Sequence, residues 1–239
     1  MSVPLLSVEI CLGGSRPVLP ANLAAARAGG AARVELCSGL AVGGLTPARW
    51  QVEAAAGLLH GGPELVVLLR PRPDFRLGPR DVESLARRMS HAALLGAGGV
   101  ALGALRGKEL DRPVMAALVR IAHELGLRVT CHRAFDGVED RQGAQEMLID
   151  LGMDRLLTSG CVWESGGSAL DGMPVLRQAL VAAAGRMELV VAGRLHPGMV
   201  PDLQQALGGR GYSLHACSGV LRRRRVDEAR VRQLVLAAS

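Results

Sequence analysis

Two short apolar stretches near the N-terminus, SVEIC and RVELC, carry the same pair of reactive side chains. Glu9 and Cys11 close the first stretch, and Glu35 and Cys37 close the second. Side chains alternate along a β-strand, so each glutamate and its cysteine share one face. Parallel neighbours lie about 4.8 Å apart, and two carboxylates that close raise a pKa unless a cation separates them. Thiolates are ligands that soft ions such as Cu(I) prefer. The pattern therefore allows an acid–base site, a soft-metal site, or a buried ion network that only fixes the barrel.

A second concentration of polar groups is the stretch CHRAFDG, which follows an apolar run in the middle of the chain. By alternation only one of His132 and Arg133 can point inward, and we expect His132, in step with Thr130. Asp136 is expected to tie down the following loop. Arg70, at the end of ELVVLLR, is the candidate for the cation between the two glutamates.

These side chains must be positioned by a repeated unit of short apolar strand, loop and alanine- and leucine-rich helix. The predicted strands are 7–11, 33–37, 64–70, 99–103, 128–132, 155–160, 187–193 and 212–216. The predicted helices lie near 20–28, 47–58, 79–95, 109–125, 141–151, 171–184, 199–207 and 227–237. Eight units in succession favour an α/β fold consisting of a single (β/α)₈ TIM-type barrel over residues 1–239; a doubly wound sheet is the alternative.

Barrel enzymes carry their sites at the carboxyl ends of the strands. The stretches EICLGGS, ELCSGLAVGG, LRPRPDF, CHRAFDG and LTSG are all such ends. The fold therefore predicts that the candidate residues share one mouth.

The composition narrows the classes of function. The chain is 49% hydrophobic with a net charge of +6, and its only dense basic run is Arg222 to Arg225. Nucleic-acid binding is not expected, because no zinc finger, helix-turn-helix or aromatic RNA-binding signature accompanies that run. No apolar run reaches the roughly 18 residues that a membrane span needs, and no signal-like segment opens the chain. Lys108, the single lysine, falls in a loop, which disfavours Schiff-base chemistry.

Five cysteines are widely spaced, without a CxxC motif. This argues against a disulfide framework and a structural zinc site and favours a reducing cytoplasm. Cys131 is expected to face the helices, whereas Cys161 and Cys217 fall near the mouth as accessory thiols.

The motifs VEICLGG, AARVELCSGLAVGGLTP, LRPRPDF, CHRAFDG and RLLTSG resemble the CutC family over about Val8 to Ser218. The resemblance implies a (β/α)₈ barrel and a cytoplasmic protein linked to copper homeostasis. It also implies Cu(I) binding through Cys11 and Cys37 in some members, and a barrel mouth that looks like an enzyme site without an assigned substrate.

Three stretches depart from the family pattern. RPRPDF is shorter than the usual loop and has Pro73 where the family has a flexible Gly-Gly, which predicts a stiffer loop. AGRLHPG places Arg194 and His196 where small residues are usual, which puts a backbone phosphate cradle in doubt. LHACSGVLRRRR keeps His215 and then becomes strongly basic.

Two functions follow from these residues. In the first, Cys11 and Cys37 bind Cu(I), with His132 or Cys217 as a third ligand. In the second, the barrel is a lyase or isomerase without an organic cofactor, acting on a small anionic metabolite. There Glu9 or Glu35 is the general base and His132 the acid or electrophile.

The enzyme hypothesis assigns the remaining polar residues to the substrate. Arginines are expected to bind the carboxylate or phosphate of the substrate. Asp136 and Ser159 are expected to orient the substrate or these arginines. The predicted substrate-binding residues are Arg70, Arg72, Arg133, Ser159 and Arg194. A non-catalytic barrel used for assembly is a third hypothesis, and a homo-oligomer is compatible with all three.

Overall fold

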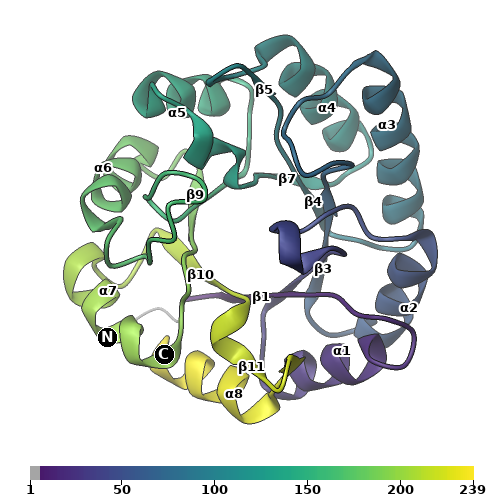
Figure 1. The fold of residues 1–239 in the computed structure, drawn as a ribbon, viewed down its shortest axis with the longest axis vertical. Helices are drawn as coiled ribbons and strands as arrows, with labels where there is room; N and C mark the ends of the chain where they lie inside the picture. The colour runs from purple at the N-terminus through teal and green to yellow at the C-terminus, as the bar shows by residue number, and fades with distance from the viewer. Residues whose placement is uncertain (1–5) are drawn as a thin grey trace.

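The computed structural model describes residues 6–239 and shows a closed barrel of eight parallel strands inside a ring of helices (Figure 1). The barrel strands are β1 Val8–Leu12, β2 Arg33–Leu36, β3 Glu64–Leu69, β4 Gly99–Leu102, β7 Arg128–Cys131, β8 Arg155–Thr158, β9 Glu188–Val191 and β10 Tyr212–Ala216. They are hydrogen-bonded in sequence order, and β10 closes onto β1. The predicted (β/α)₈ barrel is confirmed.

Each barrel strand is followed by one helix, as the repeated unit predicts. The helices are α1 Leu19–Ala28, α2 Arg49–Leu59, α3 Pro79–Leu94, α4 Arg112–Glu124, α5 Arg141–Asp150, α6 Met173–Ala183, α7 Val200–Leu207 and α8 Glu228–Ala237. Aspartate side chains accept hydrogen bonds from first-turn N–H groups of α4, α5 and α8, through Asp111, Asp140 and Asp227. These caps fix where the helices begin.

Two small hairpins in the loops are absent from the sequence-based prediction. β5 (Leu105–Arg106) pairs with β6 (Glu109–Leu110), which makes α4 start later than expected. β11 (Leu221–Arg222) pairs with β12 (Arg225–Val226). The two arginines between β11 and β12 have φ angles of 51° and 64°, which a two-residue hairpin turn of the primed type requires. The basic run is therefore an exposed turn on the mouth side of the barrel.

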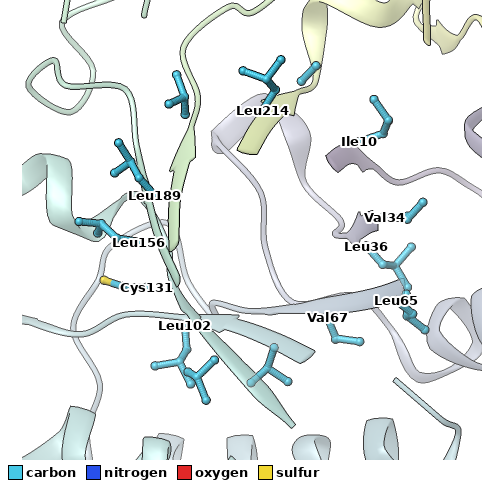
Figure 2. Packing of buried hydrophobic residues seen from close by; sticks show 14 of the residues in the cluster. Ile10, Val34, Leu36, Leu65, Val67, Leu102, Cys131, Leu156, Leu189 and Leu214 are labelled. Atoms are coloured by element: carbon cyan, nitrogen blue, oxygen red, sulfur yellow. The ribbon is translucent and has the colours of Figure 1, made fainter. Parts of the chain in front are cut away.

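The main core lies between the strands and the surrounding helices. Figure 2 shows Cys131 there with Leu102 and Leu156 from the two neighbouring strands. Its outward orientation, expected from the alternation, is confirmed. Inside the barrel the waist is apolar and consists of Val66, Leu68, Ala101, Leu157, Val190 and Ala192.

Below this waist, polar residues near the start of six strands form a network of ion pairs and hydrogen bonds, here called the floor network. Its members are Glu9, Arg33, Glu64, Arg155, Glu188 and Ser213. Arg33 donates to Glu9 at 3.1 Å and to Glu188 at 2.9 Å. Arg155, 1% exposed, donates to Glu64 at 3.0 Å and to Glu188 at 3.3 Å. Each buried arginine thus has two carboxylate partners, which fixes the relative positions of five strands.

Residues 6–239 include no helix that is both long enough and apolar enough to cross a bilayer.

Candidate functional site

A cavity of about 240 Å³ opens at the carboxyl ends of the strands, above the apolar waist. Its wall includes side chains from the first three strands or their ends, namely Cys11, Glu35 and Arg70. His132 and His215, from the ends of β7 and β10, complete the buried polar part of the wall. The expectation that candidate residues from distant stretches share one mouth therefore holds for these side chains.

One wall of the cavity is a cluster of Cys11, Glu35 and His215, whose ligand atoms lie within 4.8 Å of one another. His215 also joins the two glutamates. Its Nδ1 lies 2.7 Å from Glu9 Oε1, and its Nε2 lies 3.6 Å from Glu35 Oε2. The cation between the carboxylates is therefore His215, and the prediction that Arg70 would separate them is wrong.

The three titrating groups of this arrangement shift in a consistent way. Burial raises the pKa of Glu35, and the charge on His215 offsets this only in part. Burial acts on Glu9 in the same sense, but the hydrogen bond to His215 and the charges on His215 and Arg33 hold its pKa below the ordinary value. Burial lowers the pKa of His215, whereas the bond to Glu9 and both carboxylates raise it, with a net rise. Glu9 is thus the fixed anion, and Glu35 is the carboxyl group that holds a proton more readily.

The cysteines predicted as metal ligands lie together. Cys11 Sγ is 3.5 Å from Cys37 Sγ, although the two cysteines are not at matched positions: the register pairs Cys11 with Glu35, and Cys37 follows two residues later. A hydrogen bond with Cys217 lowers the pKa of Cys11, but the contact with Cys37, burial and the charge on Glu35 raise it further. Cys11 and Cys217 line the cavity, whereas Cys37 is fully buried and does not.

Arg70 follows β3, the neighbour of β2, and forms another part of the cavity wall. Its guanidinium donates to the carbonyl oxygens of Val42 and Gly44 at 2.8 and 2.9 Å, and also to that of Pro73. It lies over the rings of Phe75 and Trp163, at 4.5 and 5.3 Å from the ring centroids. The β2–α2 loop and the altered RPRPDF loop thus both hold this arginine.

His132 points into the barrel, as the alternation predicts, and lines the cavity. Its Nδ1 accepts a hydrogen bond from Ala134 N–H at 3.2 Å, which leaves the ring proton on Nε2. Burial and the nearby charge of Arg70 lower the pKa of His132 to about 3. Gly103 makes room for the ring, since a Cβ there would lie 2.7 Å from it.

The residues after His132 build an anchor for the mouth loops. The Asp136 carboxylate accepts from Arg133 Nε at 2.7 Å and from Ser159 N and Oγ at 3.2 and 2.9 Å. Thr158 Oγ1 also donates to it. Arg133 Nη2 donates to Ser159 Oγ at 2.9 Å. Of these, only Arg133 lines the cavity, and Asp136 and Ser159 lie behind its wall.

The two remaining predicted arginines differ. Arg72 is bound to Asp81 at 2.8 Å on the surface and does not line the cavity. Arg194 lines the cavity and is exposed, with its backbone at φ 52°. The structure therefore brings Arg194 to the mouth and leaves Arg72 outside it.

Sequence reasoning missed two residues of the site. His215 alternates in register with Ser213 and Cys217, so the strand pattern contained the signal for its inward position. Trp163 lies in the β8–α6 loop, and no periodicity places such a loop residue over Arg70.

These observations define a TIM-barrel protein whose mouth holds a thiol, a carboxylate and an imidazole in ligating range of one another. The family model of the CutC family matches residues 6–219, so the chain belongs to the CutC family.

Named relatives agree with this assignment. The mouse copper homeostasis protein cutC homolog is 36% identical over 213 residues, which covers 88% of this chain and 72% of that protein. A family protein CutC of Bacteroides thetaiotaomicron is 40% identical over 186 residues, 77% of this chain and 67% of that protein. The solved structure of a CutC copper homeostasis protein from Streptococcus agalactiae has a TM-score of 0.78 at 24% identity and covers 88% of this chain and 98% of that one, which shows the shared fold.

Proposed function

We propose that this CutC-family chain binds Cu(I) at the barrel mouth, with Cys11 as the central ligand. The observation that carries the proposal is the thiol of Cys11 on the cavity wall, 3.5 Å from the thiol of Cys37. The Cys217 thiol, hydrogen-bonded to Cys11, and the imidazole of His215 offer further ligands. Thiolate and imidazole donors are those that monovalent copper takes, so the donor set fits the ion.

The names of two relatives support the same role, because the mouse and human proteins are each named copper homeostasis protein cutC homolog. The proposed location is the cytoplasm, where the five free cysteines stay reduced. A homo-oligomer is compatible with this role, since the barrel mouth lies within one chain.

A Cu(I) competition titration against a chromophoric chelator under reducing conditions tests the proposal. The native chain should withdraw one equivalent of Cu(I), and the Cys11→Ser/Cys37→Ser variant should not. Cys131→Ala is the matched control, because Cys131 is also a buried strand-end cysteine but faces the helices. Equal competition by the native chain and the double variant would refute the copper site.

A second candidate function is acid–base catalysis on a small anionic metabolite. It is favoured by the Glu9–His215–Glu35 arrangement, in which Glu35 has a raised pKa beside a cavity. Such a group is suited to proton transfer near neutral pH. In this candidate Glu35 is the general base, Glu9 positions His215, and His132 is a neutral electrophile.

This candidate is tested by proton exchange. The native chain and Glu35→Gln are incubated in D₂O with a panel of small carboxylic and phosphorylated metabolites and followed by proton NMR. Exchange or conversion that requires Glu35 supports an isomerase or lyase. A panel left unchanged by the native chain argues against it.

A further inference from the structure

Next to the strand that carries Glu35, the cavity wall holds a buried arginine, Arg70, that has no counterion in the described part of the chain. Arg70 is 3% exposed, and within residues 6–239 it forms no salt bridge with a carboxylate. The nearest acidic groups that influence it, Glu164 and Asp74, are exposed loop residues. Burial of an unpaired charge is costly, so this arrangement is stable only because the three carbonyls and two aromatic rings compensate for lost water.

The compensation of Arg70 is incomplete. A guanidinium has five N–H donors, and the carbonyls of Val42, Gly44 and Pro73 take three of them. The Nε–H is buried without an acceptor in the described part of the chain, and one N–H of Nη2 is left as well. The two rings lie 4.5 and 5.3 Å from the guanidinium carbon and 5.1 Å from each other, so both pack on one side of it. The Nε–H and the remaining N–H of Nη2 are the donors that an acceptor can still approach.

His132 repeats this pattern beside Arg70. Its ring is 3% exposed, and Nε2 has no hydrogen-bond partner among residues 6–239. Because Nδ1 is an acceptor from Ala134, Nε2 carries the hydrogen. Phe75 packs against both side chains, at 5.3 Å from the imidazole and 4.5 Å from the Arg70 guanidinium. The neutral imidazole therefore offers a donor next to the cation without repelling it.

The charge and the volume of the mouth cavity favour a small anion as its ligand. Arg194 and Arg133 line the same cavity, which adds positive charge at its rim. The volume of about 240 Å³ is at or below the small end of ordinary ligand pockets. Charge-assisted bonds from arginine to carboxylate or phosphate oxygens are among the strong ones in proteins.

We propose that the mouth cavity binds a small organic oxyanion, a carboxylate or a phosphate, on the Nε and Nη2 donors of Arg70 and the Nε2–H of His132. Phe75 and Trp163 flank the anion site, and the rest of the ligand extends toward Cys11, Glu35 and His215. The inference deepens the acid–base candidate by assigning its substrate-binding end, and in that respect it rests on that candidate. It does not depend on copper.

The first experiment measures binding to the native, metal-free chain by calorimetry, with inorganic phosphate in one arm and malonate in the other. In parallel, ¹⁵N-histidine NMR follows the imidazole of His132, assigned with His132→Phe. Binding at about 1 mM or tighter in either arm, together with a shift of the His132 Nε2–H signal, is the expected result. The arm with the tighter binding identifies the oxyanion. Absence of both heat and shift in both arms overturns the proposal.

Variants then localise the site. Arg70→Lys and His132→Phe should each weaken binding at least tenfold. Arg210→Gln is the matched control, since it removes one exposed arginine from the loop before β10, at the floor end of the barrel, and it should bind like the native chain. Native-like binding by both site variants would contradict the assignment. Should Arg70→Lys fail to fold, His132→Phe and the NMR shift of the unsubstituted chain still decide it.

The outcomes separate this inference from the functions above. Anion binding without any turnover in the metabolite panel supports the anion site and argues against catalysis. Cu(I) retention without anion binding overturns the anion site and leaves the copper proposal standing.

Discussion

At the floor of the barrel, Arg33 and Arg155 each contact two carboxylates. At the mouth, Arg70 has carbonyl and aromatic partners but no ion pair within residues 6–239, and Glu35 contacts the thiol of Cys11 and, at 3.6 Å, the imidazole of His215. Both ends are buried and charged. The floor network satisfies its charges within the chain, whereas the mouth leaves donors and a protonatable carboxyl group directed at a cavity.

The difference indicates what each end does. A buried ion network that is complete fixes geometry, because removing any partner exposes an uncompensated charge. Polar groups left incomplete are retained where a ligand completes them. Glu9 connects the two ends, since one carboxylate oxygen accepts from Arg33 and the other contacts His215. The floor therefore holds His215 in place for the mouth.

Backbone strain is also greater at the mouth of the barrel than at the floor. Among the described residues, four of the five non-glycine residues with left-handed φ angles lie in loops that follow the carboxyl ends of strands: Glu164, Arg194, Arg223 and Arg224. The fifth, Ala184, ends α6 on the floor side. Strained conformations of this kind cluster at functional sites. The mouth thus combines incomplete polar groups with strained loops.

The largest effect is expected at the floor. Arg155→Met removes one of the two arginines that contact each of Glu64 and Glu188, and should lower the free energy of unfolding by about 2–3 kcal/mol. Denaturant unfolding measures this change. Arg120→Gln, which breaks an exposed helix pair with Glu124, is the control and should leave the midpoint unchanged. A small loss in Arg155→Met would mean that the floor is not what fixes the barrel.

The second effect is a pH dependence that originates at the mouth. The pKa of His132 is lowered from the ordinary 6.5 to about 3 by burial and by Arg70. Between these values the unfolded chain binds a proton that the folded chain does not, so stability falls as pH drops from 6.5 toward 3. The slope from this residue is at most about 1.4 kcal/mol per pH unit.

His132→Phe tests this pH dependence, because it removes the titrating group and keeps a ring. Unfolding free energies of the native chain and the variant, measured from pH 7 down to pH 4, should converge as pH falls. Parallel curves would show that His132 titrates normally in the folded chain.

The third prediction concerns a carboxyl group that does not stabilise the fold. The pKa of Glu35 is raised by burial, so its ionised form is disfavoured in the folded chain above the ordinary pKa of 4.5. Glu35→Gln should therefore leave stability at neutral pH unchanged or increase it, by about 1–2 kcal/mol at most. Denaturant unfolding at pH 7 is the measurement. A clear loss of stability would place Glu35 with the floor network instead.

The alternation of side chains was enough to predict much of this site. It placed the two Glu-x-Cys pairs and His132 inward and Cys131 outward, because strands of period two leave no other choice. The eight helices followed from the repeated unit, with ends shifted by a few residues.

The parts that could not be predicted depend on contacts between distant loops. The partners of Arg70 are backbone carbonyls of residues 42, 44 and 73, and their positions exist only once two loops have folded over it. The charge of Arg70 suggested that it lies between the two glutamates. In the structure His215 occupies that position, since it contacts both Glu9 and Glu35. A buried ion network that includes Glu9 was one of the interpretations, but its other members were missed, although charged residues open β2, β3, β8 and β9.

The smallest effect is expected in the β11–β12 hairpin at the rim of the mouth. Arg223 and Arg224 occupy left-handed conformations, which cost an L-residue other than glycine about 1–2 kcal/mol. Arg223→Asn/Arg224→Gly supplies residues that suit this turn and should raise the free energy of unfolding by about 1 kcal/mol. Arg222→Gln/Arg225→Gln removes the same charge outside the two left-handed positions, and is the matched control. A gain in the first variant alone would establish that the rim stores backbone strain. Equal changes in both would assign the effect to charge, and the greater backbone strain of the mouth would then have to rest on Glu164 and Arg194.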